Sequence, residues 1–182
     1  MTEEARIEHS DVGAYATSPG WFVLNIADAR WEQAEEAGHW TDIEPPGGFE
    51  HYGIGIHVLQ PGQPNGKYHS ENFQEDFLVL SGECVLVIEG EERPLKAWDF
   101  VHCPPGSDHI FVGAGDGPCV IVMAGARSES NVITYPRDET ALRHGAGVET
   151  ETQKPREAYA PFPQWSDGPP ASWDGTPWSD AP

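Results

Sequence analysis

The chain has few basic residues. Only 10 of its 182 residues are Lys or Arg, against 30 Asp and Glu, which gives a formal net charge of −20. A protein that binds nucleic acid or an anionic membrane needs clustered basic side chains to neutralise phosphates. We therefore expect neither partner, and we attribute the acidity to solubility rather than to an acidic docking surface.

Cysteines and long apolar segments are also scarce. The three cysteines, Cys84, Cys103 and Cys119, are odd in number and lack paired spacing, which favours reduced core thiols over a disulfide framework. The first residues are polar and acidic, and no apolar run is long enough for a membrane span or a signal peptide. These features predict a cytoplasmic protein.

Glycine and proline are plentiful, with 20 and 17 residues, which suits many turns rather than long helices. Apolar residues alternate with others from His51 to Val58. Further short apolar runs follow, with glycine or proline turns between them, at 77–80, 84–89, 95–103, 110–112 and 119–124. Short strands at this spacing are typical of an antiparallel sandwich or barrel.

Two flanking parts complete the expected organisation. Residues 1–48 form an N-terminal arm with a short helix over 28–37, a segment rich in Ala, Glu and Gln. The barrel covers 49–126, and 127–182 form an irregular C-terminal extension with a Pro- and Trp-rich tail. Exposed tryptophans are costly, so packing of the tail on the barrel or on a second copy in a homodimer is one expectation. Disorder beyond residue 168 is the other.

Four side chains near the middle of the chain are candidate metal ligands. His69, Glu71 and Glu75 have the same parity along one predicted strand, and His109 begins another strand after a proline–glycine turn. Imidazole and carboxylate groups bind divalent ions such as Mn, Fe or Zn. A cation would also remove the cost of burying two carboxylates. The alternative is an ordinary polar strand in contact with water.

The order and spacing of these residues resemble a known family. Two segments are similar to the first and second motifs of cupins: His69-x-Glu71-x3-Glu75-x6-Gly82 and Pro104-x-Gly106-x2-His109. The resemblance covers residues 50–126. It implies an all-β fold, the double-stranded β-helix or jelly-roll barrel, with a metal near its centre held by these His and Glu residues.

Four positions depart from the family pattern. Gly62, the glycine before the first histidine, lies one residue further upstream than usual. Glu71 stands where a second histidine is usual, Trp98 where a glycine usually opens the second motif, and Gly113 where an asparagine is common. Two carboxylates would make the site formally neutral with a divalent ion, and hard oxygen donors favour Mn, Fe or Zn over Cu. Alternatively, Glu71 does not ligate and acts as a general base beside a three-ligand ion.

The resemblance implies a metal-dependent oxygenase, decarboxylase or isomerase acting on a small molecule. The competing hypothesis is a non-catalytic cupin that binds a small ligand and keeps a structural or vestigial metal site. Phe77 and Phe111 share the parity of the metal ligands, which makes them candidates for a pocket wall or for ordinary barrel packing. His57 lies opposite the aliphatic stripe of its strand, and we expect it to contact water rather than the pocket.

Overall fold

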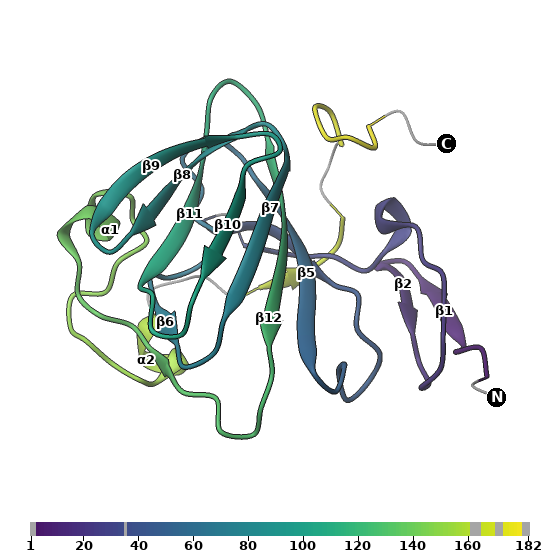
Figure 1. Ribbon diagram of the computed structural model, residues 1–182. Helices are drawn as coiled ribbons and strands as arrows, with labels where there is room; N and C mark the ends of the chain where they lie inside the picture. The colour runs from purple at the N-terminus through teal and green to yellow at the C-terminus, as the bar shows by residue number, and fades with distance from the viewer. Residues whose placement is uncertain (1–2, 35, 161–164, 170–172, 180–182) are drawn as a thin grey trace.

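The computed structural model describes residues 3–34, 36–160, 165–169 and 173–179. They form an all-β protein in which two antiparallel sheets face each other, with the two short helices at the side of the barrel (Figure 1). This is the double-stranded β-helix that the sequence predicts. No helix of the described residues is long and apolar enough to cross a bilayer.

The larger sheet has seven strands, which are in spatial order β10 (Phe100–Cys103), β7 (Glu75–Ser81), β12 (Cys119–Ala126), β5 (Tyr52–Leu59), β4 (Gly38–Asp42), β3 (Glu32–Ala34) and β14 (Ser166–Asp167). The facing sheet has three, which are β11 (His109–Ala114), β8 (Glu83–Ile88) and β9 (Glu91–Lys96). Two smaller pairs are β1 (Ile7–Ser10) with β2 (Gly13–Ala16), and β6 (Ser70–Glu71) with β13 (Ile133–Thr134). The helices are α1 (Glu139–Arg143), α2 (Pro155–Ala158) and one 3-10 turn, Ile26–Asp28.

The space between the sheets holds the main core. Its buried members come from both sheets and are Leu59, Phe77, Val79, Cys84, Leu86, Cys103, Phe111, Cys119 and Ile121. The three cysteines are free and buried, as the sequence predicts. They pack here as small apolar side chains.

The large sheet is also covered on its outer face. Ile56 and Val58 of β5 pack there against Trp31, and Trp173 of the C-terminal tail lies 5.0 Å from Trp31 between ring centroids. This part of the tail therefore packs on the barrel. The aliphatic stripe of β5 faces this outer layer, so His57 faces the barrel interior, and its expected position in contact with water is wrong.

The helix expected over 28–37 is also wrong. The 3-10 turn ends at Asp28, and β3 and β4 form a hairpin that extends the large sheet. Strand β4 of this hairpin also pairs with β5, where His39 lies opposite Val58 and Thr41 lies opposite Ile56. Backbone pairing with β5 outweighs the helical propensity of a short local sequence.

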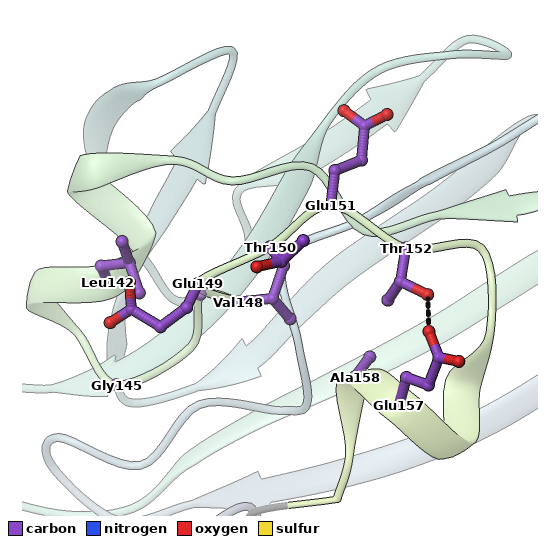
Figure 2. Close-up of a pocket in the computed structure, with 10 residues that line it drawn as sticks. Leu142, Gly145, Val148, Glu149, Thr150, Glu151, Thr152, Glu157 and Ala158 are labelled. Atoms are coloured by element: carbon purple, nitrogen blue, oxygen red, sulfur yellow. Dashed lines mark hydrogen bonds between the residues drawn. The ribbon is translucent and has the colours of Figure 1, made fainter.

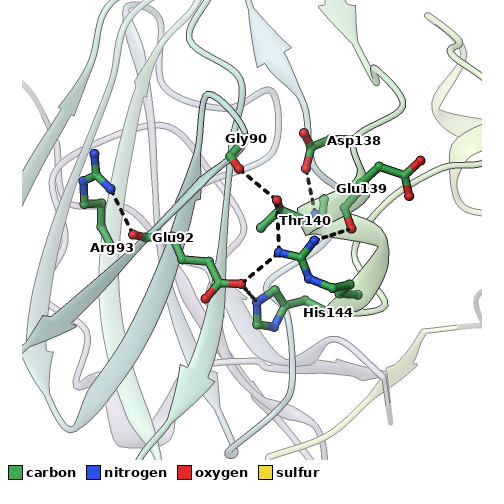
Figure 3. A network of polar contacts seen from close by, with 9 residues as sticks. Gly90, Glu92, Arg93, Asp138, Glu139, Thr140 and His144 are labelled. Carbon is green, nitrogen blue, oxygen red and sulfur yellow. Dashed lines mark hydrogen bonds and ion pairs between the residues drawn. The ribbon is translucent and has the colours of Figure 1, made fainter.

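Helix α1 docks on the β8–β9 hairpin through polar contacts (Figure 3). Thr140 Oγ1 donates to the carbonyl oxygen of Gly90 at 2.8 Å. Glu92 Oε1 lies 3.0 Å from His144 Nε2 and 3.4 Å from Arg143 Nη2. Asp138 caps the helix by accepting from the backbone of the first turn at 2.8 Å. The C-terminal extension is thus attached to the barrel at a defined point.

Trp98 has a strained backbone. Its φ is +75°, a left-handed conformation, and its side chain gains little from burial because the residue is 74% exposed. This conformation costs a residue other than glycine about 1–2 kcal/mol. We therefore expect Trp98→Gly to raise the free energy of unfolding by about 1 kcal/mol, measured by urea denaturation.

Phe100→Gly is the matched control. Phe100 is also exposed but lies within strand β10, where glycine should lower stability. A loss of stability in Trp98→Gly would contradict the strain argument and would point to a packing partner for the indole. The predicted homodimer stays a prediction, and light scattering on the same variants would test whether this exposed pair lies at its interface.

Candidate metal centre

Two histidines and one glutamate converge at one end of the barrel interior. His69 and His109 face each other across a backbone bridge, with reciprocal N–H···O bonds of 3.1 and 2.8 Å and ring centroids 5.1 Å apart. Glu75 begins β7, and its Oε2 lies 3.5 Å from His109 Nε2. One potential ligand atom from each of the three residues lies within 4.8 Å of the other two.

Hydrogen bonds fix the orientation of both imidazoles. His69 Nδ1 lies 2.7 Å from the carbonyl oxygen of Lys67, and His109 Nδ1 lies 3.0 Å from that of Ser107. Because a carbonyl oxygen can only accept, each Nδ1 carries the proton and donates it. Each Nε2 is left with a free lone pair, as in most histidines that bind metals.

The protonation of the three groups suits a cation. Burial, with a smaller contribution from the neighbouring His69, lowers the pKa of His109 to about 4. Burial also lowers the pKa of His69. Both rings are therefore neutral near pH 7. Burial, with a smaller contribution from Glu71, raises the pKa of Glu75 to about 8, so its charge is poorly stabilised by protein groups alone. A divalent ion fits this donor set.

Glu71 lies outside this group of three. Its Oε2 accepts a hydrogen bond of 2.9 Å from Asn131 Nδ2. The Glu71 charge is close enough to act on both neighbours. It adds to the raised pKa of Glu75, and at His69 it partly opposes the lowering of the pKa by burial. Ligation by Glu71 stays a prediction, and this hydrogen bond favours the alternative of a carboxylate beside a three-ligand ion.

The position of Glu71 follows from a break in the chain. Residues 69–77 do not form the single strand that the sequence predicts, because residues 72–74 separate β6 from β7. Asn72 makes three hydrogen bonds to the segment 130–132, at 2.7, 2.9 and 3.1 Å. These contacts pair β6 with β13 instead of continuing it into β7, so parity does not carry across the break.

Phe77 and Phe111 lie directly against His109. The Phe77 ring centroid is 4.6 Å from that of Phe111 and 5.1 Å from that of His109. Both phenylalanines are fully buried members of the main core. They pack the barrel core and contact the His109 ring, which confirms the expectation of barrel packing. Their role as a pocket wall stays a prediction.

The C-terminal extension supplies contacts that sequence reasoning missed. Lys67 is buried, and its Nζ donates to the carbonyl oxygens of Gly145 and Gly147 at 3.1 and 3.3 Å. The Tyr135 ring lies 5.9 Å from the His69 ring. These partners are 66 or more residues apart in the sequence, and no local pattern links them. The extension therefore completes the surroundings of His69.

Lys67→Met should detach this part of the extension. The change leaves two carbonyl oxygens without their donor, and we expect a loss of about 2–3 kcal/mol in the free energy of unfolding. Lys154→Met is the control, because Lys154 is exposed in the same extension. Urea unfolding measures both variants, and equal small losses would contradict a structural role for Lys67.

A separate cavity of about 410 Å³ lies between α1 and α2, but it is not a candidate metal site. Figure 2 shows Glu149, Glu151 and Glu157 at this cavity with carboxylates that point in different directions. Glu157 accepts a hydrogen bond of 2.7 Å from Thr152. Within the described part of the chain, only the group at His69 has the spacing needed to hold a metal ion.

The fold and the motifs identify the family. Residues 55–125 match the cupin domain family, and this match supports the cupin superfamily for the barrel. Gly113, a departure from the second motif, has a structural reason: a Cβ atom there would lie 2.3 Å from the backbone oxygen of Gln60. No curated protein matches the chain.

Several solved structures are similar to this barrel. A putative sugar phosphate isomerase from Acidithiobacillus ferrooxidans is 30% identical, with 48% of this chain and 57% of that chain covered and a TM-score of 0.46. The polyketide cyclase RemF from Streptomyces resistomycificus is 18% identical, with 58% and 79% covered and a TM-score of 0.51. KdgF from Halomonas sp. is 19% identical, with 54% and 89% covered and a TM-score of 0.46. The chain thus spans just over half the length of the isomerase. The likeness to RemF concerns the fold alone.

Proposed function

We propose that this protein is a metal-dependent cupin enzyme that acts on a small molecule, with oxygenase chemistry as its reaction class. The observation that carries the proposal is the convergence of His69, Glu75 and His109, with both Nε2 lone pairs directed by backbone hydrogen bonds. Two imidazoles and one carboxylate, with further positions open, are the ligand set of non-haem iron oxygenases. Glu75 also lines a cavity of about 200 Å³, which gives a ligand access to the site.

Each residue has a defined part in this proposal. A divalent ion at the site would supply Lewis-acid chemistry by polarising a substrate oxygen. The histidines and Glu75 hold the ion, and Phe77 and Phe111 keep water from the buried side of His109. Glu71, which Asn131 holds beside the site, accepts a proton from the substrate as general base.

Oxygen consumption tests the reaction class. Protein reconstituted with Fe(II) is assayed in an oxygen electrode with catechols, hydroxy acids and keto acids, and products are followed by mass spectrometry. We expect uptake with one of these classes, none in His109→Ala, and a rate about 100-fold lower in Glu71→Gln.

The other outcomes separate the alternatives. Turnover without oxygen uptake would overturn the oxygenase assignment in favour of a decarboxylase or isomerase. Binding without any turnover would favour the non-catalytic cupin. His51→Ala is the control for loss of a histidine, because its side chain is exposed and lies outside the site.

A further inference from the structure

The cavity at Glu75 lies inside the barrel and extends away from the metal ligands. It has a volume of about 200 Å³, and its lining includes Trp40, His57, Met123 and Arg127. Trp40, Glu44 and Arg127 all lie outside the cupin match of 55–125. The part of this cavity that distinguishes the chain is therefore built by the N-terminal arm and by the segment that follows the barrel.

Glycines make room for the cavity. Across three neighbouring strands, Gly53 pairs with Gly125 and Gly125 pairs with Glu75. In the next row Gly55 pairs with Met123. Glu75, these three glycines and Met123 all line the cavity. Strand positions without side chains leave a space directly beside the proposed metal ligand.

Two ring nitrogens at this cavity lack partners. Trp40 and His57 stack with centroids 6.1 Å apart and an angle of 24°. Trp40 Nε1 and His57 Nδ1 are buried and have no hydrogen-bond partner in the described part of the chain. Burial lowers the pKa of His57 to about 4, so the imidazole is neutral near pH 7. Buried polar groups without partners are unfavourable. The Trp40 N–H can only donate, and an acceptor oxygen on a ligand would satisfy it, while a hydroxyl oxygen there would also suit either tautomer of His57.

At the other end of the cavity a guanidinium is held in place. The buried Glu44 carboxylate, 3% exposed, accepts from the backbone N–H groups of Phe49 and Ile54 at 2.9 and 3.1 Å. It also pairs with Arg127 Nη1. Arg127 Nε and Nη2 lie 3.0 Å from the point where a Cβ atom on Gly53 would stand. The guanidinium thus lies over the same row of residues that contains Glu75.

We propose that this cavity binds a small carboxylic acid of roughly ten non-hydrogen atoms, a size estimated from the 150 Å³ cavity that holds benzene. The carboxylate pairs with Arg127, whose planar fork of donors suits it. An acceptor oxygen at the other end of the molecule faces Trp40 and His57. This inference rests on the proposed function, because the cavity opens onto the metal ligand Glu75 and the bound acid would be the substrate.

Calorimetric titration of the metal-free 182-residue chain tests the proposal with benzoate and three aromatic analogues of benzoate. We expect benzoate to bind at least 10-fold more tightly than its neutral counterpart benzamide. 4-Hydroxybenzoate, which adds an oxygen at the far end, should bind about 5-fold more tightly than benzoate. The comparison of probes on the unaltered protein needs no variant, so a folding defect cannot obscure it.

Variants of the cavity residues show which residue contacts each end of the bound probe. Arg127→Gln should remove the preference for benzoate over benzamide, whereas Arg127→Lys should keep part of it. Trp40→Phe should remove the preference for the 4-hydroxyl group and leave the carboxylate preference intact. Arg93→Gln is the control, because Arg93 is an exposed arginine on β9. Circular dichroism checks that each variant is folded.

Three results would overturn the inference: equal binding of benzoate and benzamide, tighter binding of phenyl phosphate than of benzoate, or no binding of any probe. Failure here is distinct from failure of the proposed function. A protein that binds metal but shows no carboxylate preference would keep the function and lose the inference. A protein that prefers carboxylates but takes up no metal would do the reverse.

Discussion

Replacing Glu75 with glutamine should stabilise the metal-free protein at alkaline pH. Burial raises the pKa of this carboxyl group from its ordinary value of 4.5 to about 8. An acid with a raised pKa in the folded state prefers to keep its proton there. Its contribution is therefore fully present below pH 4.5 and is lost as pH rises through 8. Glutamine has no proton to lose, so we expect the variant to exceed the wild type by about 3–5 kcal/mol above pH 9.

Urea unfolding of chelator-treated protein between pH 5 and pH 10 measures this difference. Glu50→Gln is the control, because the Glu50 side chain is 87% exposed. With saturating Mn(II) the order should reverse, because only the wild type gains from binding the ion. Parallel pH profiles for the wild type and Glu75→Gln would contradict the raised pKa and remove one argument for a cation at this position.

Loss of either histidine should abolish tight metal binding. His69→Ala or His109→Ala removes an Nε2 ligand, and we expect the affinity for Mn(II) or Zn(II) to fall more than 100-fold, measured by competition with a chelating dye. Glu71→Gln should cost less than about 10-fold, because glutamine keeps the shape and the hydrogen bond to Asn131 can reform. The difference between the affinity lost in the histidine variants and that lost in Glu71→Gln distinguishes a three-ligand site from a four-ligand site.

The matched pair of glutamates makes this test specific. Glu75→Gln and Glu71→Gln remove the same charge at neighbouring positions, so a difference between them cannot arise from net charge alone. If both variants lose the metal equally, Glu71 ligates and the four-ligand prediction is right. If the histidine variants keep their affinity, the convergence of His69, Glu75 and His109 does not bind metal.

The strands and three of the four candidate ligands follow from local features of the sequence. Alternating residues and glycine turns specify the barrel strands, and the cupin spacing places Glu75 and His109 at the starts of β7 and β11. These signals act over a few residues, so no knowledge of distant contacts is needed to read them.

The parts that were missed depend on contacts between distant segments. The arm was expected to contain a helix, but pairing of β4 with β5 makes it part of the large sheet. The aliphatic face of β5 predicts that His57, on the opposite face, contacts water. In the structure Trp31 and Trp173 cover the aliphatic face, so the face with His57 is the inner one. The single strand expected to carry Glu71 and Glu75 is interrupted at residues 72–74, where the Asn72 side chain hydrogen-bonds to Ser130 and Val132.

Some predictions concern residues that the structure does not describe. One prediction is that the chain is disordered beyond residue 168. Part of that segment, residues 170–172 and 180–182, lies outside the described residues. For Trp173 and Trp178, the expectation of packing on the barrel holds, with ring centroids 5.0 and 6.1 Å from Trp31. Buried aromatic surface explains why this proline-rich segment stays against the sheet.

Elemental analysis of protein purified without added metal tests the central claim most directly, with Glu75→Gln and Glu71→Ala purified in parallel. The account predicts close to one equivalent of Mn, Fe or Zn in the wild type, a similar content in Glu71→Ala and almost none in Glu75→Gln. Absence of metal from the wild type, even after reconstitution, would contradict a metal centre at His69, Glu75 and His109.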